Sequence, residues 1–233
     1  MLILFDVDGT LLLSQGAGMK AMIEAGRELF GGSFSFEGVE FAGRLDPLIW
    51  SAAAQLNGVA DTSENHDRFR RAYGACLRRH FEADPTARLL PGVRRLIDAL
   101  RATDHLTLGL LTGNYPETGQ LKIRTAGLDP AIFTVAAWGH EAATRRELPA
   151  VAMDRYKQRM GRVIEPREVV VIGDTPHDID CAHVNGCRAI GVATGPVHSL
   201  EDLRAHEPEL AVADLTDTRA VLAWLLEIQA AAP

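Results

Sequence analysis

The sequence predicts an α/β protein built on a doubly wound parallel sheet, with a helical cap domain inserted near the N-terminus. Short apolar segments rich in Val, Ile and Leu alternate with helical segments, a pattern typical of parallel sheets buried on both faces. A long segment after the first apolar run has helical periodicity and no convincing strand. Several apolar runs also end in polar or acidic residues, and open α/β sheets bind ligands at the carboxyl ends of their strands.

The apolar runs and the segments between them indicate the elements of the core. We expect strands over residues 2–5, 106–111, 133–137, 169–172 and 189–193. We expect helices over residues 93–102, 116–126, 148–160 and 179–185, with Gly186 as the C-cap of the last. The resulting order of strand and helix predicts a parallel sheet.

Residues 15–90 are predicted to form the helical cap domain, and residues 1–14 and 91–233 the α/β core domain. Apolar residues recur at helical spacing over 18–30, 48–56 and 69–81, and we expect four helices in this insertion. Pro91 and Gly92 form a breaker pair that marks the return of the chain to the core.

Composition excludes several classes of function. The formal net charge of −7 argues against nucleic acid as a partner, because duplex binding needs a basic face. The three cysteines form no CxxC pair, so neither a disulfide framework nor a zinc ribbon is indicated. No apolar stretch approaches the roughly 20 residues that cross a bilayer, and the N-terminus does not resemble a signal peptide. We therefore expect a cytoplasmic protein without a membrane partner, and leave open whether it is a monomer or a homodimer.

Two acids follow the first strand directly, in the sequence Asp6-Val7-Asp8-Gly9-Thr10. Side chains alternate in an extended backbone, so residues two apart point the same way and both carboxylates can share a pocket. Two neighbouring acids attract a divalent hard cation that offsets their repulsion. An acidic turn after a strand is the competing interpretation, and other motifs are needed to decide.

Two further strands end in groups that suit phosphate and metal chemistry. Thr112, Gly113 and Asn114 supply a hydroxyl, backbone amides and a side-chain amide for phosphate oxygens, although Thr-Gly-Asn is also a good turn. Asp174 ends the strand at 169–172, and Asp178 follows about one helical turn later. An acid at a helix start is also favoured as an N-cap without any metal.

Taken together, the order of these motifs resembles the haloacid dehalogenase-like hydrolase superfamily, in particular its phosphoglycolate phosphatase-like branch with a helical cap. The resemblance implies a Rossmann-like core and a covalent mechanism in which Asp6 attacks phosphorus. It implies that Asp8 is the general acid and base, with its backbone carbonyl on the metal. It also implies a Mg²⁺ site formed by Asp6, Asp8, Asp174 and Asp178, and a phosphoryl site at Thr112, Gly113 and Asn114.

The sequence departs from the family pattern at the third motif, where a lysine is expected. The stretch is Thr144-Arg145-Arg146-Glu147-Leu148-Pro149, and the next lysine is Lys157, well inside the following helix. We expect Arg145 to hold the transferring phosphate, with Arg146 as the second choice, because a guanidinium matches phosphate oxygens. The alternative is a solvated basic pair before a helix.

The cap sequence Phe41-Ala42-Gly43-Arg44-Leu45-Asp46 resembles the loop that relatives project over the active site. Arg44 is therefore a candidate for contacting a substrate carboxylate or a second phosphate, and an ion pair with Asp46 is equally compatible. Leu13 is a further departure, because many relatives carry an acid there.

The predicted function is a Mg²⁺-dependent phosphatase that acts on a small phosphorylated, phosphoglycolate-like metabolite through an aspartyl phosphate. A phosphomutase shares all four motifs, and a phosphonate hydrolase requires a cap lysine, for which Lys20 is the one candidate. A dehalogenase is disfavoured because it does not need Asp8. A signalling receiver is disfavoured because such domains are about half as long as this chain. A catalytically silent binding module is disfavoured because Asp6, Asp8, Asp174 and Asp178 are all present. The identity of the phosphorylated substrate stays open.

Overall fold

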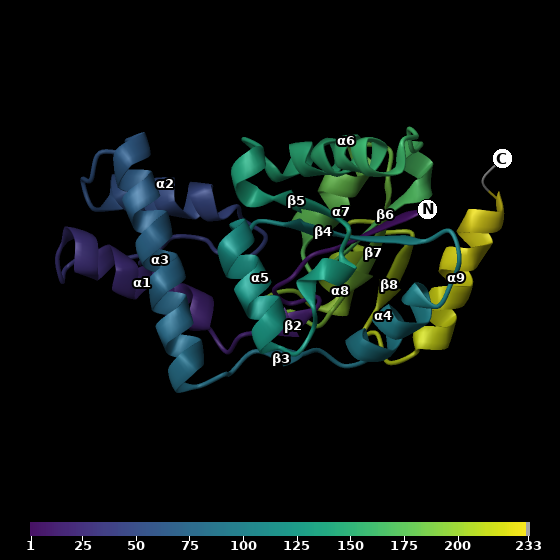
Figure 1. The fold of residues 1–233 in the computed structure, drawn as a ribbon, viewed down its shortest axis with the longest axis horizontal. Coiled ribbons are helices and arrows are strands. Elements are labelled where there is room, and N and C mark those ends of the chain that lie inside the picture. The colour runs from purple at the N-terminus through teal and green to yellow at the C-terminus, as the bar shows by residue number, and fades with distance from the viewer. Residues whose placement is uncertain (232–233) are drawn as a thin grey trace.

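The computed structural model describes residues 1–231 and contains a six-stranded sheet covered by helices, with a smaller helical unit beside it (Figure 1). Each neighbouring pair of strands in the sheet is parallel. In spatial order the strands are β5 (Val135–Trp138), β4 (Thr107–Thr112), β1 (Leu2–Phe5), β6 (Val169–Gly173), β7 (Arg188–Val192) and β8 (Leu210–Val212). The chain order reverses at the centre, beside β1, which is where open α/β sheets bind ligands.

Helices cover both faces of the sheet, which confirms the doubly wound fold. Ile3 and Phe5 of β1 face one apolar cluster, and Leu2 and Leu4 face the other, so the strand is buried on both sides. The first cluster includes residues of α4 (Val93–Arg101), α5 (Pro116–Thr125) and α9 (Thr218–Ala231). The second includes residues of α6 (Leu148–Met160), α7 (Pro176–His183) and α8 (Leu200–Arg204).

The inserted unit has its own apolar core, formed by α1 (Ala17–Phe30), α2 (Asp46–Leu56) and α3 (Ser63–Ala83). Aromatic rings dominate this core, and the Trp50 and Phe69 rings stack with centroids 4.7 Å apart. The expectation of four helices is wrong for the described residues. The inserted unit contains three, and Phe34 and Phe36 pack into its core from the connection between α1 and α2, which contains no helix.

A short pair of strands joins the two units. The chain leaves the core through β2 (Leu12–Leu13) and returns through β3 (Arg88–Leu89), and these strands pair antiparallel. The backbone N–H of Leu90 also donates to the carbonyl of Leu11, at 3.0 Å. This neck lies beside the predicted division at residues 14 and 91, and the unit formed by α1, α2 and α3 is named the cap.

Two core elements differ from the expectation. Strand β8 was not expected, because its three residues are only half-buried and make a weak pattern. Helix α7 begins at Pro176 rather than at residue 179 and ends at His183, with Val184 and not Gly186 at its C-cap. It starts early because Thr175 and Asp178 form a capping box and proline is favoured in the first turn. Within residues 1–231, no helix combines the length and the apolar character that crossing a bilayer requires.

Candidate active site

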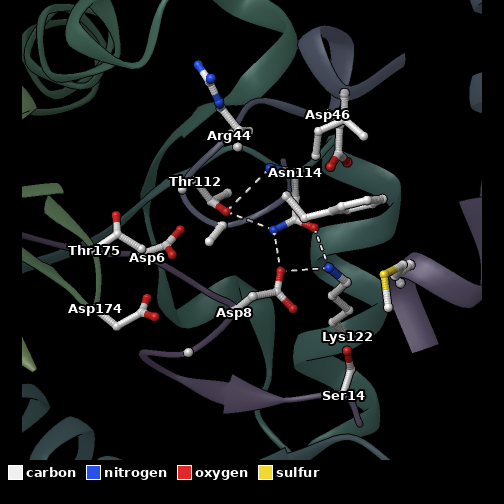
Figure 2. A pocket seen from close by; sticks show the side chains of 18 of the residues that line it. Asp6, Asp8, Ser14, Arg44, Asp46, Thr112, Asn114, Lys122, Asp174 and Thr175 are labelled. Carbon is white, nitrogen blue, oxygen red and sulfur yellow. Dashed lines mark hydrogen bonds and ion pairs between the residues drawn. The ribbon is translucent and has the colours of Figure 1, made fainter. Parts of the chain in front are cut away.

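The carboxyl ends of β1, β4 and β6 meet at a cavity of about 550 Å³ between the core and the cap. Figure 2 shows Asp6 and Asp174 on one side of this cavity and Asp8, Asn114 and Lys122 on the other. The sheet places Asp6 beside β6, since the Asp6 backbone N–H donates to the carbonyl of Ile172 at 2.9 Å. Residues far apart in sequence therefore reach one site because their strands are parallel neighbours.

Three buried acids form a tight cluster. One carboxylate oxygen from each of Asp6, Asp174 and Asp178 lies within 4.8 Å of the others. Burial raises the pKa of Asp6 to about 6, and the charge of Arg145 opposes this shift. Burial and the neighbouring acids Asp6 and Asp178 raise the pKa of Asp174 well above its usual value. The mutual repulsion of three buried oxygen donors is the condition that a hard divalent cation relieves.

Glycines allow Asp174 to reach this cluster. A Cβ at Gly9 would lie 2.2 Å from Asp174 Oδ2, and a Cβ at Gly195 would lie 1.8 Å from it. Gly9 also has a φ of 82°, which disfavours other residues. The hydroxyl of Thr10 donates to Asp174 Oδ1 at 3.2 Å and helps to orient the carboxylate. Any side chain at Gly9 or Gly195 would displace Asp174.

Arg145 lies within the acid cluster. Its Nη2 is 3.1 Å from Asp6 Oδ1 and also donates to Asp178, while Nη1 donates to the carbonyl of Gly43 in the cap at 3.3 Å. The guanidinium is buried, and its Nε has no hydrogen-bond partner among the described residues. A buried donor without a partner is costly, and it is a position where an anionic ligand would be stabilised.

Asp178 is held by several donors at the start of α7. The backbone N–H and the hydroxyl of Thr175 donate to its Oδ2, at 3.1 and 2.7 Å, while Oδ1 accepts from Arg145. A Cβ at Gly173 would lie 2.1 Å from the Asp178 carboxyl carbon, so this approach also requires glycine. Asp178 therefore caps the helix and contributes to the acid cluster at the same time.

The turn after β4 joins the core to the cap. Thr112 Oγ1 accepts from Asn114 Nδ2 at 2.8 Å, which orients the Asn114 amide. Gly113 lies directly under the cap loop, because a Cβ there would lie 2.0 Å from the carbonyl oxygen of Arg44. The backbone N–H of Asp46 donates to the carbonyl of Gly113 at 2.8 Å. The residues expected to hold the phosphoryl group thus also anchor the cap.

The sequence analysis missed Lys122, a buried residue on α5. Its ammonium donates to Asp8 Oδ2 and to Asn114 Oδ1, both at 2.6 Å, and Asn114 Nδ2 donates to the same Asp8 oxygen at 2.8 Å (Figure 2). A signal was available, because Lys122 falls on the buried face of an amphipathic helix, one turn after Thr118 and beside Ile123. A lysine is almost never buried without a charged partner.

The two other candidate arginines lie differently from Arg145. Arg44 lines the cavity, but its guanidinium points away from Asp6 and Asp8 in Figure 2 and pairs with Glu40 at 2.6 Å. The expected alternative partner, Asp46, is instead buried and accepts from the backbone N–H of Tyr115 at 2.9 Å. Arg146 is 63% exposed, pairs with Asp180 and is not among the cavity residues. This arrangement favours Arg145 over Arg146 for the third motif.

Asp46 gives a prediction for stability. Burial is the main cause that raises its pKa to about 7, against the attraction of Lys122. The folded protein then holds a proton on Asp46 that the unfolded chain loses near pH 4, so this contribution is full at low pH and is lost as pH rises to about 7. Asp46→Asn is expected to gain about 2 kcal/mol or more in unfolding free energy relative to the wild type between pH 5 and pH 8. Urea titrations of both proteins at the two pH values measure it, and an unchanged difference would contradict the assignment.

Comparisons with known proteins agree with this geometry. Residues 1–186 match the family of haloacid dehalogenase-like hydrolases. The chain is 26% identical over 212 residues to a protein of Dickeya dadantii named as a probable phosphatase, IndB, covering 91% of this chain and 88% of the relative. It is 27% identical over 224 residues to a phosphoglycolate phosphatase of Vibrio vulnificus, covering 91% of each chain.

Solved structures support the fold. A structure described as a predicted phosphoglycolate phosphatase from Haemophilus somnus superposes with a TM-score of 0.70 at 20% identity, covering 95% of this chain and 97% of that one. A β-phosphoglucomutase from Clostridium difficile superposes with a TM-score of 0.71 at 13% identity, covering 98% of both chains. The matched family, the phosphatase relatives and the acid cluster at the carboxyl edge of the sheet agree with the predicted resemblance: this chain is an enzyme of the haloacid dehalogenase-like hydrolase family.

Proposed function

We propose that this hydrolase is a Mg²⁺-dependent phosphatase that cleaves a small phosphate monoester through an aspartyl phosphate on Asp6. The observation that carries the proposal is the different surroundings of two acids two residues apart. Asp6 is buried in the acid cluster beside Arg145, whereas Asp8 is 41% exposed and bound by Lys122 and Asn114. One acid is therefore suited to attack a bound phosphoryl group, and the other to exchange protons at the cavity.

The reaction follows from these two roles. An Asp6 oxygen forms a bond to phosphorus while the bond from phosphorus to the leaving oxygen breaks, and the Asp8 carboxylic acid gives its proton to that oxygen. Asp8, now a carboxylate, takes a proton from a water molecule whose oxygen attacks the phosphorus of the aspartyl phosphate. The bond between Asp6 and phosphorus then breaks, which regenerates the Asp6 carboxylate and releases inorganic phosphate. Asp8 again carries a proton.

The cation and phosphoryl sites are proposed on the donors available. Asp6, Asp174 and Asp178, together with the backbone carbonyl of Asp8, are oxygen donors of the kind Mg²⁺ prefers, and three buried acids fit a dication. When bound, Mg²⁺ supplies charge stabilisation for the phosphoryl oxygens.

The phosphoryl oxygens are assigned to donors from two parts of the cavity lining. Arg145 lies beside Asp6 in the acid cluster, while the hydroxyl of Thr112 and the backbone amides of Gly113 and Asn114 lie at the end of β4. A phosphoryl group attacked by Asp6 would be held by these donors.

The structure disfavours one of the two alternative activities, a phosphonate hydrolase, and leaves the other, a phosphomutase, open. A phosphonate hydrolase needs a cap lysine in the cavity, but Lys20 is exposed and lines a separate surface hollow with Glu24 and Glu28. A phosphomutase stays an alternative, because two similar structures, described as a β-phosphoglucomutase and a putative β-phosphoglucomutase, share the fold with this chain. The expected cytoplasmic location and the monomeric or dimeric state stay predictions.

Phosphate release from a panel of monoesters, with Mg²⁺ and with the metal removed by EDTA, tests the proposal. We expect turnover that requires Mg²⁺ and returns when Mg²⁺ is added back. Transfer of the phosphoryl group to a sugar phosphate, without release of inorganic phosphate, would show a mutase instead. A folded protein that turns over no ester and transfers no phosphoryl group would overturn the proposed function.

Lys122 gives a prediction of its own. Replacing Lys122 by methionine removes the ammonium that holds Asp8 and leaves Asn114 as its side-chain partner, so we expect kcat to fall by about 10- to 100-fold. We expect KM to change less than kcat, because Lys122 contacts the proton-exchanging acid and Asn114. Lys157→Met is the matched control, since Lys157 is exposed on α6 and is expected to keep the wild-type rate. An unchanged kcat in a folded Lys122→Met protein would limit Lys122 to a packing role.

A further inference from the structure

The cavity has two chemically distinct walls. The strand ends supply its acids and phosphoryl donors, whereas the neck and the cap supply a wall that is mainly apolar. This apolar wall consists of Leu13, Met19, Met22, Phe41, Ile49 and Tyr73. A leaving group bound between core and cap would contact this wall, because the phosphoryl group occupies the strand ends. Apolar walls with few polar groups are typical of sites for apolar ligands.

The cations that line the cavity are already matched by carboxylates. Arg145 contacts Asp6 and Asp178, and Lys122 contacts Asp8. Arg44, at the cap side, pairs with Glu40. Within residues 1–231, each cation that lines the cavity therefore already has a carboxylate partner. A leaving group with its own carboxylate or phosphate would have to displace one of these carboxylates or be desolvated without a partner, which is unfavourable.

Exposed apolar side chains flank the mouth of the cavity from both units. Met19 of α1, in the cap, is 46% exposed, and Val197, in the loop between β7 and α8 of the core, is 59% exposed. Pro196 lies beside Val197 in the same lining. Exposed apolar residues gathered at a binding cavity mark a surface that becomes buried when an apolar partner binds. Methionine is well suited to this because its side chain adapts to ligands of different shape.

We propose that the substrate is the phosphate monoester of an uncharged, mainly apolar alcohol, and not of a small carboxylic acid. The inference rests on the proposed function for the role of the phosphoryl group. The cavity volume of about 550 Å³ is within the range of about 300–1,000 Å³ that is typical of sites for drug-sized ligands. The cavity is therefore larger than a two-carbon acid requires. The apolar body would lie on the cap wall, with Met19 and Val197 at its outer end.

Binding of alkylphosphonates tests this inference separately from turnover, because their P–C bond resists a phosphatase. Calorimetric titrations in the presence of Mg²⁺ would compare methyl-, butyl- and hexylphosphonate with 5-carboxypentylphosphonate, which has a chain of similar length ending in a carboxylate. We expect affinity to rise by about fourfold for each added methylene until the cavity is filled. We expect the carboxylate-ended compound to bind about 100-fold more weakly than hexylphosphonate.

A pair of variants locates the site. Met19→Gln keeps the length of an exposed side chain but makes it polar, and it is expected to lower the ratio of hexyl- to methylphosphonate affinity about fivefold. Met160→Gln, at the end of α6 and 41% exposed, is the control and should leave the ratio at its wild-type value.

The outcomes separate the two proposals. Affinity that is flat with chain length, or that favours the carboxylate-ended compound, overturns the apolar substrate class even if monoesters are hydrolysed. Affinity that rises with chain length supports it even if no monoester is hydrolysed, and the absence of hydrolysis then counts against the proposed function alone.

Discussion

Replacement of Asp6 by asparagine is expected to lower kcat by on the order of 10⁴-fold or more, because an amide cannot form the aspartyl phosphate. The change removes the nucleophilic oxygen while keeping nearly the same shape, so the fold should be retained. It also removes one buried negative charge from a cluster in which Asp6 lies within 4.8 Å of two other acids. We therefore expect a melting temperature no lower than that of the wild type.

The control is the same chemical change at Asp180→Asn on α7. Asp180 pairs with exposed Arg146 and lies outside the cavity, so its loss should leave kcat within about twofold of the wild type. Initial rates with a monoester and Mg²⁺ measure both variants. A folded Asp6→Asn protein with a rate near that of the wild type would exclude the covalent mechanism.

Arg145→Ala has the second largest expected effect, a fall in kcat of about 100-fold or more, because it removes the buried charge next to the transferring group. Arg145 contacts both Asp6 and Asp178, so its loss also leaves two buried acids without their cation. We expect the melting temperature to fall as well, and part of that loss to be recovered on adding Mg²⁺, which would bind the same acids.

The adjacent residue supplies the matched control. Arg146→Ala removes an equal charge from a side chain that is 63% exposed, and it is expected to change neither kcat nor the melting temperature appreciably. Rates measured at saturating Mg²⁺ and below the melting temperature of each variant separate catalysis from stability. A larger rate loss in Arg146→Ala than in Arg145→Ala would reverse the assignment of the third motif.

Much of the core could be predicted because its signals are local. The strand ending before Asp6 and the strand ending before Asp174 are apolar runs buried on both faces, and such runs are recognisable without knowledge of their neighbours. Elements with weak local signals were not predicted correctly. Strand β8 is short and half-buried, and the inserted unit contains three helices and not four.

Two charge pairs at the site depend on tertiary packing and not on local sequence. The place of Lys122 on the buried face of its helix indicates that it needs a charged partner, but nothing local identifies that partner as Asp8, 114 positions away in the sequence. The partner of Arg44 proved to be Glu40 rather than Asp46, because Asp46 is turned inward to accept from the Tyr115 backbone. The spacing of the residues allows Arg44 to pair with either Glu40 or Asp46. The cap loop docks on Gly113, and in this arrangement Arg44 pairs with Glu40.

The sequence by itself determined the type of fold and the order of the motifs, and it predicted Asp6, Asp8, Asp174 and Asp178 as site residues, since strand alternation and residue chemistry are local properties. Only the tertiary structure decided which charges meet. It brought Arg145 to Asp6, turned Arg146 to the solvent and bound Lys122 to Asp8. The reason is physical: a buried charge is stable only beside a partner, and that partner is supplied by whichever segment the packing of sheet and cap brings within reach.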